Sequence, residues 1–230
     1  ERVAILGPNG SGKTTLVKLI TRELYPVVRD DSYIALFGDV HVNIWDLREK
    51  IGIVSNEFQN RYETLATGLD VVVSAFFGSV GIHGHHHVTE AQKVEARNWM
   101  RDFHIADLAD EPFLKLSSGQ QRRLLLARAT IHQPKALILD EPTNSLDVKA
   151  SFHILSDLQQ FADKGVALLL ITHHIQEVIP DIERVILLKH GKIIFDGKKE
   201  DALTSKRLSD CFETSLHVMC KNDFYSWVPD

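Results

Sequence analysis

The sequence predicts an α/β fold in which a mainly parallel sheet, covered by helices, is interrupted by a mostly helical insert. The apolar runs Ala136–Leu139 and Val166–Thr172 are continuous rather than alternating, as in parallel strands that are buried on both faces. The short run Arg2–Leu6 leads through a glycine-rich loop into Thr14–Leu24, whose apolar residues have helical spacing. Between about residues 57 and 132 the alternation of strands and helices stops, and helical patterns dominate.

The same patterns predict the remaining elements and the boundaries of the fold. Further strands are expected at Ser32–Phe37, Ile51–Val54, Val185–Lys189 and Lys192–Phe195. Further helices are expected at Val88–Phe103, Gly119–His132, Val148–Lys164 and Ile175–Pro180. Thr89 followed by Gln92 is a capping-box pattern at the start of the first of these helices. We therefore expect one domain, with a core of residues 1–56 and 133–200, a helical subdomain of residues 57–132 and a C-terminal extension of residues 201–230.

The composition is that of an ordinary globular protein. Of its 230 residues 44% are hydrophobic and 25% are charged, and the formal net charge is −5. Proteins that bind nucleic acid through its phosphates usually carry an excess of basic residues, so nucleic-acid binding is not indicated. Cys211 and Cys220 are too few for a disulfide framework. No apolar run reaches the roughly 18–20 residues that span a bilayer, so we expect a soluble cytoplasmic chain, at most peripheral to a membrane.

The segment after the first strand has the pattern of a phosphate-binding loop, G-x-x-x-x-G-K-[ST]. Its glycines let backbone N–H groups turn toward phosphates, and the following helix adds the positive end of its dipole. Lys13 is expected to contact the β- and γ-phosphates of ATP as a catalytic charge, and Thr14 to offer a hydroxyl ligand to Mg²⁺. The residues expected to bind ATP are Gly7, Pro8, Asn9, Gly10, Ser11, Gly12, Lys13, Thr14 and Thr15.

A pair of carboxylates follows directly on one of the buried strands. Asp140 and Glu141 come at the end of Ala136–Leu139, and ligands of open α/β sheets bind at the carboxyl ends of the strands. Asp140 is expected to hold Mg²⁺ through its water shell, since this ion takes few protein ligands. Glu141 lies one residue further and is expected to polarise an attacking water molecule. Together with the phosphate loop, the pair predicts hydrolysis of Mg·ATP.

Three further motifs give the chain its resemblance to a known family. Leu116-Ser117-Ser118-Gly119-Gln120 resembles the LSGGQ signature of ATP-binding cassette (ABC) ATPases. Ser145-Leu146-Asp147 resembles the D-loop of that family, and Thr172-His173 resembles its switch histidine. These motifs, the phosphate loop and the acidic pair occur in the family's order and extend over about residues 1–200.

The resemblance implies a P-loop NTPase (RecA-like) core with an inserted α-helical ABC subdomain. It also implies that two such domains face each other head to tail, with ATP between the phosphate loop of one and the signature of the other. The partner is then a second ABC domain, in a homodimer or a tandem chain. Ser117 and Gly119 would contact the γ-phosphate on the opposite domain, His173 would hold the γ-phosphate and the attacking water, and Asp147 would line the dimer contact.

The chain departs from the family pattern at two positions in the motifs. Ser118 stands where the signature has glycine, and Asn56 stands where a glutamine is expected in the Q-loop, with the nearest glutamine at Gln59. In the family this loop senses Mg²⁺ and couples to a partner domain, and asparagine is one methylene shorter. The residue that stacks on adenine usually precedes the phosphate-loop strand. It is therefore expected upstream of Glu1, in a longer protein of which this chain is one part.

The resemblance leaves three alternatives for what the ATPase drives. One is a soluble cytosolic ABC protein or half of a tandem ABC protein, and the segments Arg61-Tyr62, Ser74–Ser79 and Leu203–Ser205 resemble a ModF and photorepair-like group. Another is the nucleotide-binding motor subunit of a membrane ABC transporter, bound to a membrane subunit. The third is an ATP-dependent scaffold or binding protein with little turnover, which the intact Glu141 and His173 disfavour.

Two groups of polar residues lie outside these motifs. The segment His83-Gly84-His85-His86-His87 could bind a metal, but it has no acidic or cysteine ligands beside it and is expected to be a solvated loop. Arg122, Arg123 and Arg128 are expected on a solvated face of the signature helix or facing a dimer partner.

Overall fold

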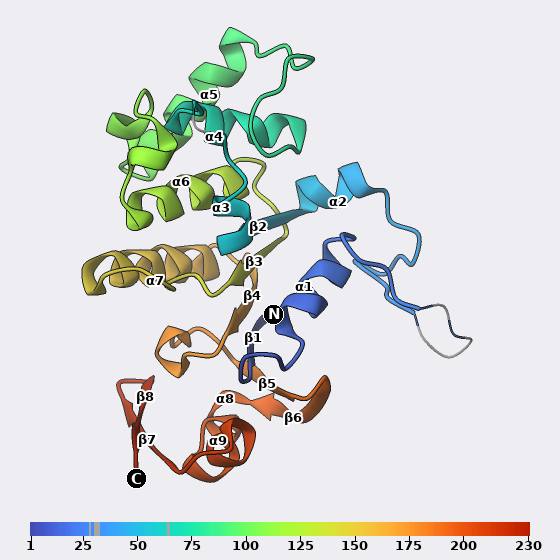
Figure 1. Cartoon of the computed structure of the whole chain (residues 1–230), viewed down its shortest axis with the longest axis vertical. Coiled ribbons are helices and arrows are strands. Elements are labelled where there is room, and N and C mark those ends of the chain that lie inside the picture. The colour runs from blue at the N-terminus through green and yellow to red at the C-terminus, as the bar shows by residue number, and fades with distance from the viewer. Residues whose placement is uncertain (28, 30–32, 64) are drawn as a thin grey trace.

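A computed structural model describes residues 1–27, 29, 33–63 and 65–230 of the chain. Figure 1 shows three regions along the long axis: a group of helices at one end, a sheet in the middle, and a helical segment with a hairpin at the other end. The strands are β1 (Arg2–Leu6), β2 (Ile51–Ser55), β3 (Ala136–Asp140), β4 (Ala167–Thr172), β5 (Arg184–Lys189), β6 (Lys192–Lys198), β7 (Leu216–Lys221) and β8 (Phe224–Pro229). The α-helices are α1 (Lys13–Ile20), α2 (Ile44–Lys50), α3 (Asn56–Gln59), α4 (Gly68–Val73), α5 (Glu90–Asp102), α6 (Ser118–Thr130), α7 (Val148–Asp163), α8 (Lys199–Ala202) and α9 (Ser205–Phe212).

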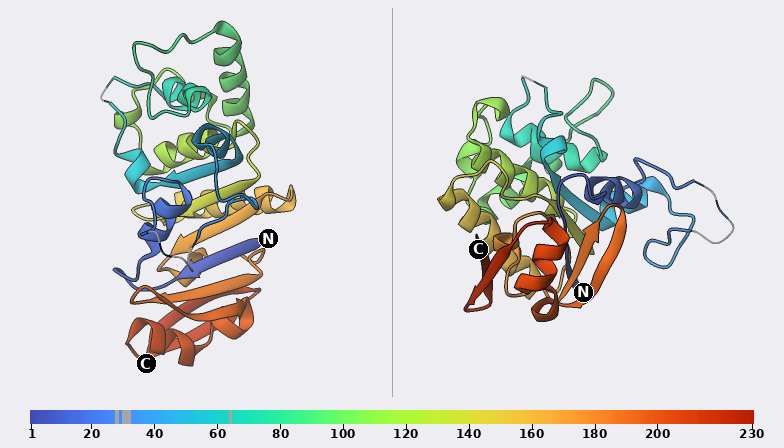
Figure 2. Two further views of the ribbon diagram at one scale, coloured as in Figure 1. Left: turned by 90° about the vertical axis from the view of Figure 1, so that its right-hand side faces the viewer. Right: turned by 60° about the horizontal axis from the view of Figure 1, so that its bottom comes forward.

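Within the described residues, six strands form the central sheet in the order β2-β3-β4-β1-β5-β6. Every neighbouring pair is parallel except β5 and β6, which form an antiparallel hairpin. Figure 2 shows these strands side by side between the helical end and the C-terminal end of the molecule. The parallel register places Ser55 opposite Asp140, and Leu6 opposite Thr172. The loops that follow β1, β2, β3 and β4 therefore leave the sheet at one edge.

Both faces of the sheet are covered, as the continuous apolar runs predict. In β3, Leu137 and Leu139 belong to the larger core cluster, whereas Ile138 packs with Val17 of α1 and Leu47 of α2 on the other face. The predicted helical segment between β2 and β3 contains α4, α5 and α6, which we call the helical region. Each of its three helices begins with a capping box, in which the side chains at the cap and three residues later satisfy each other's backbone N–H groups.

Several elements differ from the sequence-based expectations. The strand predicted at Ser32–Phe37 is absent: Ser32 lies outside the described residues, and residues 33–37 show only an isolated bridge between Leu36 and Asp39. The first helix ends at Ile20 rather than at residue 24. Helix α2 was not anticipated, although Asn43 caps it by accepting a hydrogen bond from the backbone of Trp45. These segments are short, and their apolar residues are too few for a clear period.

Gly52 marks a close approach between β2 and the C-terminal end of α6. A Cβ atom at this position would lie 2.2 Å from the carbonyl oxygen of Ala129, so only glycine fits there. Gly52→Ala is therefore expected to lower the free energy of unfolding by about 1–3 kcal/mol, the usual effect of overpacking. Gly84→Ala is the matched control, because nothing lies within 4 Å of its added Cβ. Urea denaturation of both variants measures the effect, and equal stabilities would contradict the close packing of α6 on β2.

Candidate functional site

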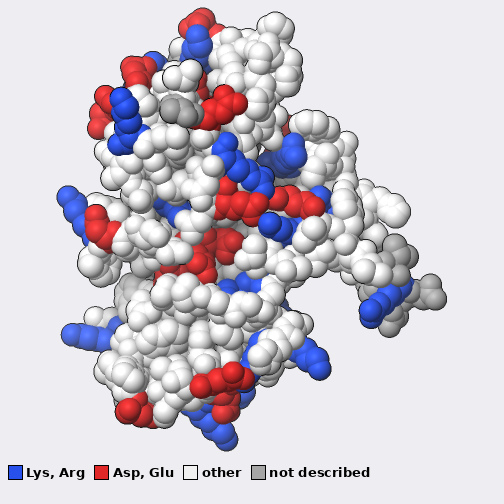
Figure 3. All heavy atoms as spheres, in the orientation of Figure 1, with Lys and Arg blue, Asp and Glu red and all other residues white. Residues whose placement is uncertain are grey.

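The candidate residues from four separate motifs meet at the carboxyl edge of the sheet. The phosphate loop follows β1, Asn56 follows β2, Asp140 ends β3 with Glu141 directly after it, and His173 follows β4. In the space-filling view of Figure 3, acidic and basic side chains gather near the centre of the face, around the position of α3 and β3 in Figure 1. The parallel sheet thus brings together side chains that are far apart in the sequence.

The phosphate loop is shaped for close approach of a ligand to its backbone. Gly10 and Gly12 have φ values of 78° and 103°, a region that side-chain-bearing residues rarely adopt. The amino group of Lys13 is buried and donates to the carbonyl oxygens of Gly7 and Pro8 at 2.8 and 3.0 Å. The hydroxyl of Ser11 is also buried and has no hydrogen-bond partner among the described residues. A loop with a buried lysine and an unpaired buried hydroxyl is suited to receive phosphate oxygens.

Oxygen-bearing side chains line part of a small cavity beside this loop. Thr14, Ser55 and Asp140 border a space of about 20 Å³, as do Lys18 and Arg61, which are ion-paired with acidic side chains. That volume holds roughly one water molecule or ion. A hydroxyl and a carboxylate are the kinds of ligand that Mg²⁺ prefers, so the residues present fit this ion.

Glu141 is held in a strained and well-oriented conformation. Its φ of 51° lies in the left-handed region, and its backbone N–H donates to the carbonyl oxygen of Ile171 at 2.8 Å. One carboxylate oxygen lies 2.6 Å from Nδ1 of His173, and the other accepts from the side-chain amide of Asn144 at 3.1 Å. Two neighbours thus fix the carboxylate, and the backbone strain lies at the predicted catalytic residue.

The charges at this edge are buried at an electrostatic cost. Burial lowers the pKa of Lys13, while the nearby carboxylates of Glu141 and Asp140 oppose that shift. Burial also raises the pKa of Asp140, and the negative charge of Glu141 raises it further. Each group therefore needs partners of opposite charge to be stable in its ionised form, which an anionic ligand and a cation would supply.

The signature residues lie at the start of α6 and touch the helix that follows the D-loop. The Ser117 hydroxyl accepts from the backbone of Gln120, whose side chain accepts from the backbone of Ser117 at 2.9 Å. Asp147 caps α7 by accepting from the backbone of Ala150 at 2.8 Å. A Cβ on Gly119 would lie 2.7 Å from the Cβ of Ala150, so the signature is in direct contact with the first turn of α7. Ser118 is exposed at the first position of the helix.

The structure corrects the expectation for the arginines of the signature helix. Arg123 and Arg128 are half-buried and donate to the carbonyl oxygens of Phe103 and Ser79. Arg122 was expected in solvent or facing a dimer partner, but its exposed fraction is 1%. It donates to the side-chain oxygen of Asn56, and the neighbouring Gln121 accepts from the amide of Gln59 at 2.6 Å. The expectation was wrong because α6 is covered on more than one side, by β2 and α3 as well as by α4 and α5.

Glu177 is a polar residue of this edge that the sequence reasoning missed. It is buried, and one of its carboxylate oxygens accepts from both the backbone and the hydroxyl of Thr143. Thr143 follows the predicted base by two residues, so Glu177 braces the turn behind Glu141. The signal was a single acidic residue among buried apolar ones in the segment 175–179.

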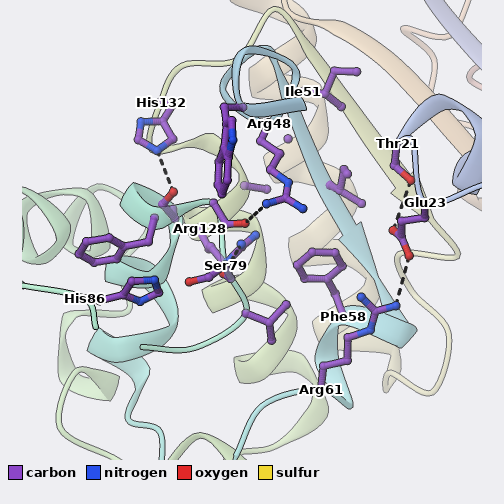
Figure 4. Close-up of a pocket in the computed structure, with 18 of the residues that line it drawn as sticks. Thr21, Glu23, Arg48, Ile51, Phe58, Arg61, Ser79, His86, Arg128 and His132 are labelled. Carbon is purple, nitrogen blue, oxygen red and sulfur yellow. Dashed lines mark hydrogen bonds and ion pairs between the residues drawn. The ribbon is translucent and has the colours of Figure 1, made fainter. Parts of the chain in front are cut away.

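A separate hollow of about 330 Å³ lies between α2, β2 and the helical region (Figure 4). Arg48 and Arg128 enter it and donate to the carbonyl oxygens of Gly78 and Ser79 at 3.0 and 2.8 Å. Its wall includes the aromatic side chains of Trp45, Phe58 and Phe77. The hollow is therefore basic and aromatic, and it does not include the phosphate loop.

The histidine-rich loop forms one rim of this hollow. His86 stacks on Phe77 with ring centroids 4.3 Å apart, and His83 and His85 lie beside it and are exposed. Over the residues that the structure describes, no group of three or more histidine, cysteine or acidic side chains is arranged to hold a metal ion. The same part of the chain contains no helix that is long and apolar enough to span a membrane.

Comparison with known proteins gives the chain its family. Residues 1–144 match the family model described as ABC transporter. The chain is 30% identical over 226 residues to YlmA, an ABC transporter ATP-binding protein of Bacillus subtilis (strain 168), covering 97% of this chain and 84% of the relative. It is 35% identical over 182 residues to the ABC transporter ATP-binding protein ModF of Escherichia coli (strain K12), which is 77% of this chain and 36% of ModF.

Solved structures agree with this similarity. A chain from a metal-chelate type ABC transporter in an inward-facing conformation has a TM-score of 0.79 and 25% identity, covering 100% of this chain and 86% of that one. The cassette MJ0796, solved as a dimer in a post-hydrolysis state with ADP and Pi, has a TM-score of 0.69 and 28% identity, covering 86% and 85%. The fold, the motifs at one sheet edge and these matches lead to one conclusion: the chain belongs to the ABC transporter family and is an ATP-binding cassette that binds and hydrolyses ATP.

Proposed function

We propose that the phosphate loop, Asp140, Glu141 and His173 together form the site at which this ATPase cleaves Mg·ATP. The observation that carries the proposal is the Glu141 carboxylate, which is held by His173 and Asn144 beside the phosphate loop. In the reaction, the oxygen of a water molecule bonds to the γ-phosphorus while the bond from that phosphorus to the β–γ bridging oxygen breaks. Glu141 accepts the proton of the water, and ADP and phosphate leave.

Lys13 and His173 have distinct roles in this proposal. The amino group of Lys13, which donates to its own loop, would turn to the β- and γ-phosphate oxygens and stabilise the charge that develops there. A carboxylate only accepts hydrogen bonds, so Nδ1 of His173 carries the proton toward Glu141. In the neutral ring Nε2 is then an acceptor that positions the attacking water, and it donates to a phosphate oxygen only in the imidazolium form.

The metal site in this proposal consists of Thr14 and Asp140. Bound Mg²⁺ would supply positive charge that neutralises the β- and γ-phosphate oxygens. Thr14 would bind it through its hydroxyl, and Asp140 through its water shell. The small cavity that both residues line supports this assignment.

We further propose that the working unit is a head-to-tail pair of ABC domains. Ser117 is exposed at the N-terminus of α6, and no hydrogen bond within the described residues joins residues 117–120 to the phosphate loop. An exposed helix N-terminus that makes no contact with its own phosphate loop is suited to bind a phosphate held by a second domain. The similar cassette MJ0796 is itself a dimer with ADP and Pi.

Two settings for the ATPase each have an observation in their favour. The match to ModF covers about a third of that protein, as expected for one half of a tandem or soluble ABC protein. The basic and aromatic hollow between α2 and the helical region favours the second setting, a motor subunit that docks a membrane subunit there. The scaffold alternative is disfavoured by the oriented Glu141 and His173 pair.

Glu141→Gln is expected to bind ATP with unchanged affinity and to lower kcat by about 10²–10⁴-fold, since a general base contributes that much. The amide cannot accept the proton of the attacking water, whereas the binding surface for the phosphates is retained. Steady-state phosphate release and light scattering with ATP measure the rate and the trapped dimer. Glu213→Gln, an exposed change near the C-terminus, is the control and keeps the wild-type rate.

Asp140→Asn is expected to stabilise the nucleotide-free protein while abolishing its response to Mg²⁺. Because the folded pKa of Asp140 is raised above 3.8, the folded protein binds more protons than the unfolded chain between these two pKa values. The free energy of unfolding of the wild type therefore falls as pH rises through this window, and the variant lacks that loss. Urea unfolding between about pH 4 and pH 7 measures the difference in free energy of unfolding between the variant and the wild type. A difference that does not increase with pH would contradict the interpretation that Asp140 is a buried charge.

The two settings are distinguished by where the trapped Glu141→Gln protein is recovered from cells. A motor subunit sediments with membranes and crosslinks to an integral membrane protein, and the added change Arg48→Glu in the hollow abolishes that crosslink. Lys192→Glu, an exposed change on β6, is the control and retains it. Recovery of the trapped protein only in the cytosol would exclude the transporter setting.

A further inference from the structure

Arg122 is the most deeply buried charged side chain that the proposed reaction does not use. Its exposed fraction is 1%, and its Nε and Nη1 atoms have no hydrogen-bond partner among the described residues. Among the described residues, the one side chain that it bonds is Asn56, whose Oδ1 atom accepts from Nη2. Burying an arginine costs free energy when its lost hydration is replaced by a single hydrogen bond. We therefore expect the side chain to have a functional role at this position.

The surroundings explain how the charge is tolerated. Burial lowers the pKa of Arg122 to about 10, so the side chain stays protonated at neutral pH, and the charges of Glu177 and Asp140 oppose the shift. The second carboxylate oxygen of Glu177 is itself buried and has no hydrogen-bond partner among the described residues. The guanidinium therefore lies within the field of the metal-binding carboxylate and of the residue that braces the turn behind Glu141.

Asn56 begins α3, at the carboxyl edge of the sheet. It directly follows Ser55, which pairs with Asp140 in the sheet and lines the same small cavity as Thr14 and Asp140. Arg122 lies on α6, the helix whose first turn carries the signature residues. The Arg122–Asn56 hydrogen bond thus connects the carboxyl end of β2 with the signature helix, beside a second one between Gln59 and Gln121.

Only an arginine can make this connection in the observed way. Its planar fork lets Nη2 bond Asn56 while the other two nitrogens point elsewhere with the charge spread over all three. Lysine has the charge but a single compact donor on a flexible stem. The asparagine is also matched to the arginine, because its carbonyl oxygen is the acceptor that the guanidinium engages.

We propose that Arg122 is a positioning residue that holds the side-chain oxygen of Asn56 at the metal-binding edge and so ties the signature helix to the occupancy of that edge. The inference rests on the proposed placement of Mg²⁺ at Thr14 and Asp140. Arg122 acts through Asn56 and does not touch the nucleotide. A shift of α6 moves Asn56, and a ligand that orders Asn56 restrains α6.

The test compares the Mg²⁺ requirement of single and double variants of the full chain. Asn56→Ala removes the acceptor, and Arg122→Lys keeps the charge but not the fork. Arg123→Lys is the matched control on the next position of α6, where the native side chain donates to the backbone of Phe103. The readout is the concentration of Mg²⁺ that gives half of the thermal stabilisation by ATP, together with kcat and KM for hydrolysis.

Asn56→Ala and Arg122→Lys are each expected to raise the half-saturating Mg²⁺ by about 10-fold, a common effect of losing an outer-shell partner of a metal site. The double variant is expected to show about the same 10-fold rise, because both changes break one connection. Arg123→Lys leaves the requirement unchanged. If lysine is not accommodated in the fold, Arg122→Met, which has no N–H donor for Asn56, replaces it in the same comparison.

Three results would overturn the proposal, and the last is distinguishable from the first two. If Asn56→Ala raises the Mg²⁺ requirement but the Arg122 variants do not, or if the two effects multiply, Arg122 does not act through Asn56. If Asp140→Asn leaves the Mg²⁺ requirement unchanged, the proposed metal edge is itself wrong and this inference fails with it.

Discussion

The parallel pairing of β1, β2, β3 and β4 is the constraint on which the rest of the site depends. Parallel strands have their carboxyl ends at the same edge, so each loop that follows a strand is delivered to one place. The register is set by apolar side chains that are buried on both faces, and a slip of one residue would exchange the two faces of every strand. Hydrophobic packing of the strands therefore determines where the polar side chains of the loops lie.

The site that results contains more buried charge than the protein alone can compensate. Burial is the main reason that the pKa of Lys13 is lowered and that of Asp140 is raised. Both shifts favour the neutral form of the group. Arg122 lies nearby with one hydrogen bond to a neutral acceptor. Such an arrangement is destabilising in isolation, but it is complementary to a ligand that brings both a polyanion and a cation. Binding of Mg·ATP would therefore compensate part of the free energy that it costs to bury these charges.

Helix α6 connects this edge with the rest of the molecule. Its first turn contacts the start of α7 at Gly119 and Ala150, and its middle reaches Asn56 and Gln59 after β2. Its C-terminal end packs against β2 at Gly52. These contacts are close and leave little room for independent movement, so a displacement of α6 involves the signature, the D-loop helix and the loop after β2 together.

The sequence by itself determined the α/β class, the phosphate loop, the acidic pair at the end of β3 and the family. These are local features: continuous apolar runs, glycines at set spacing and carboxylates next to a buried strand are all visible within a few residues. It could not place Arg122 or Glu177, because a charged residue in a helix or after a strand is normally solvated. Only the tertiary structure decided that α6 is enclosed on several sides, that Arg122 reaches Asn56, and that Glu141 is gripped by His173 and Asn144. Those contacts join residues distant in the chain, and their geometry follows from how the sheet and helices pack rather than from any local pattern.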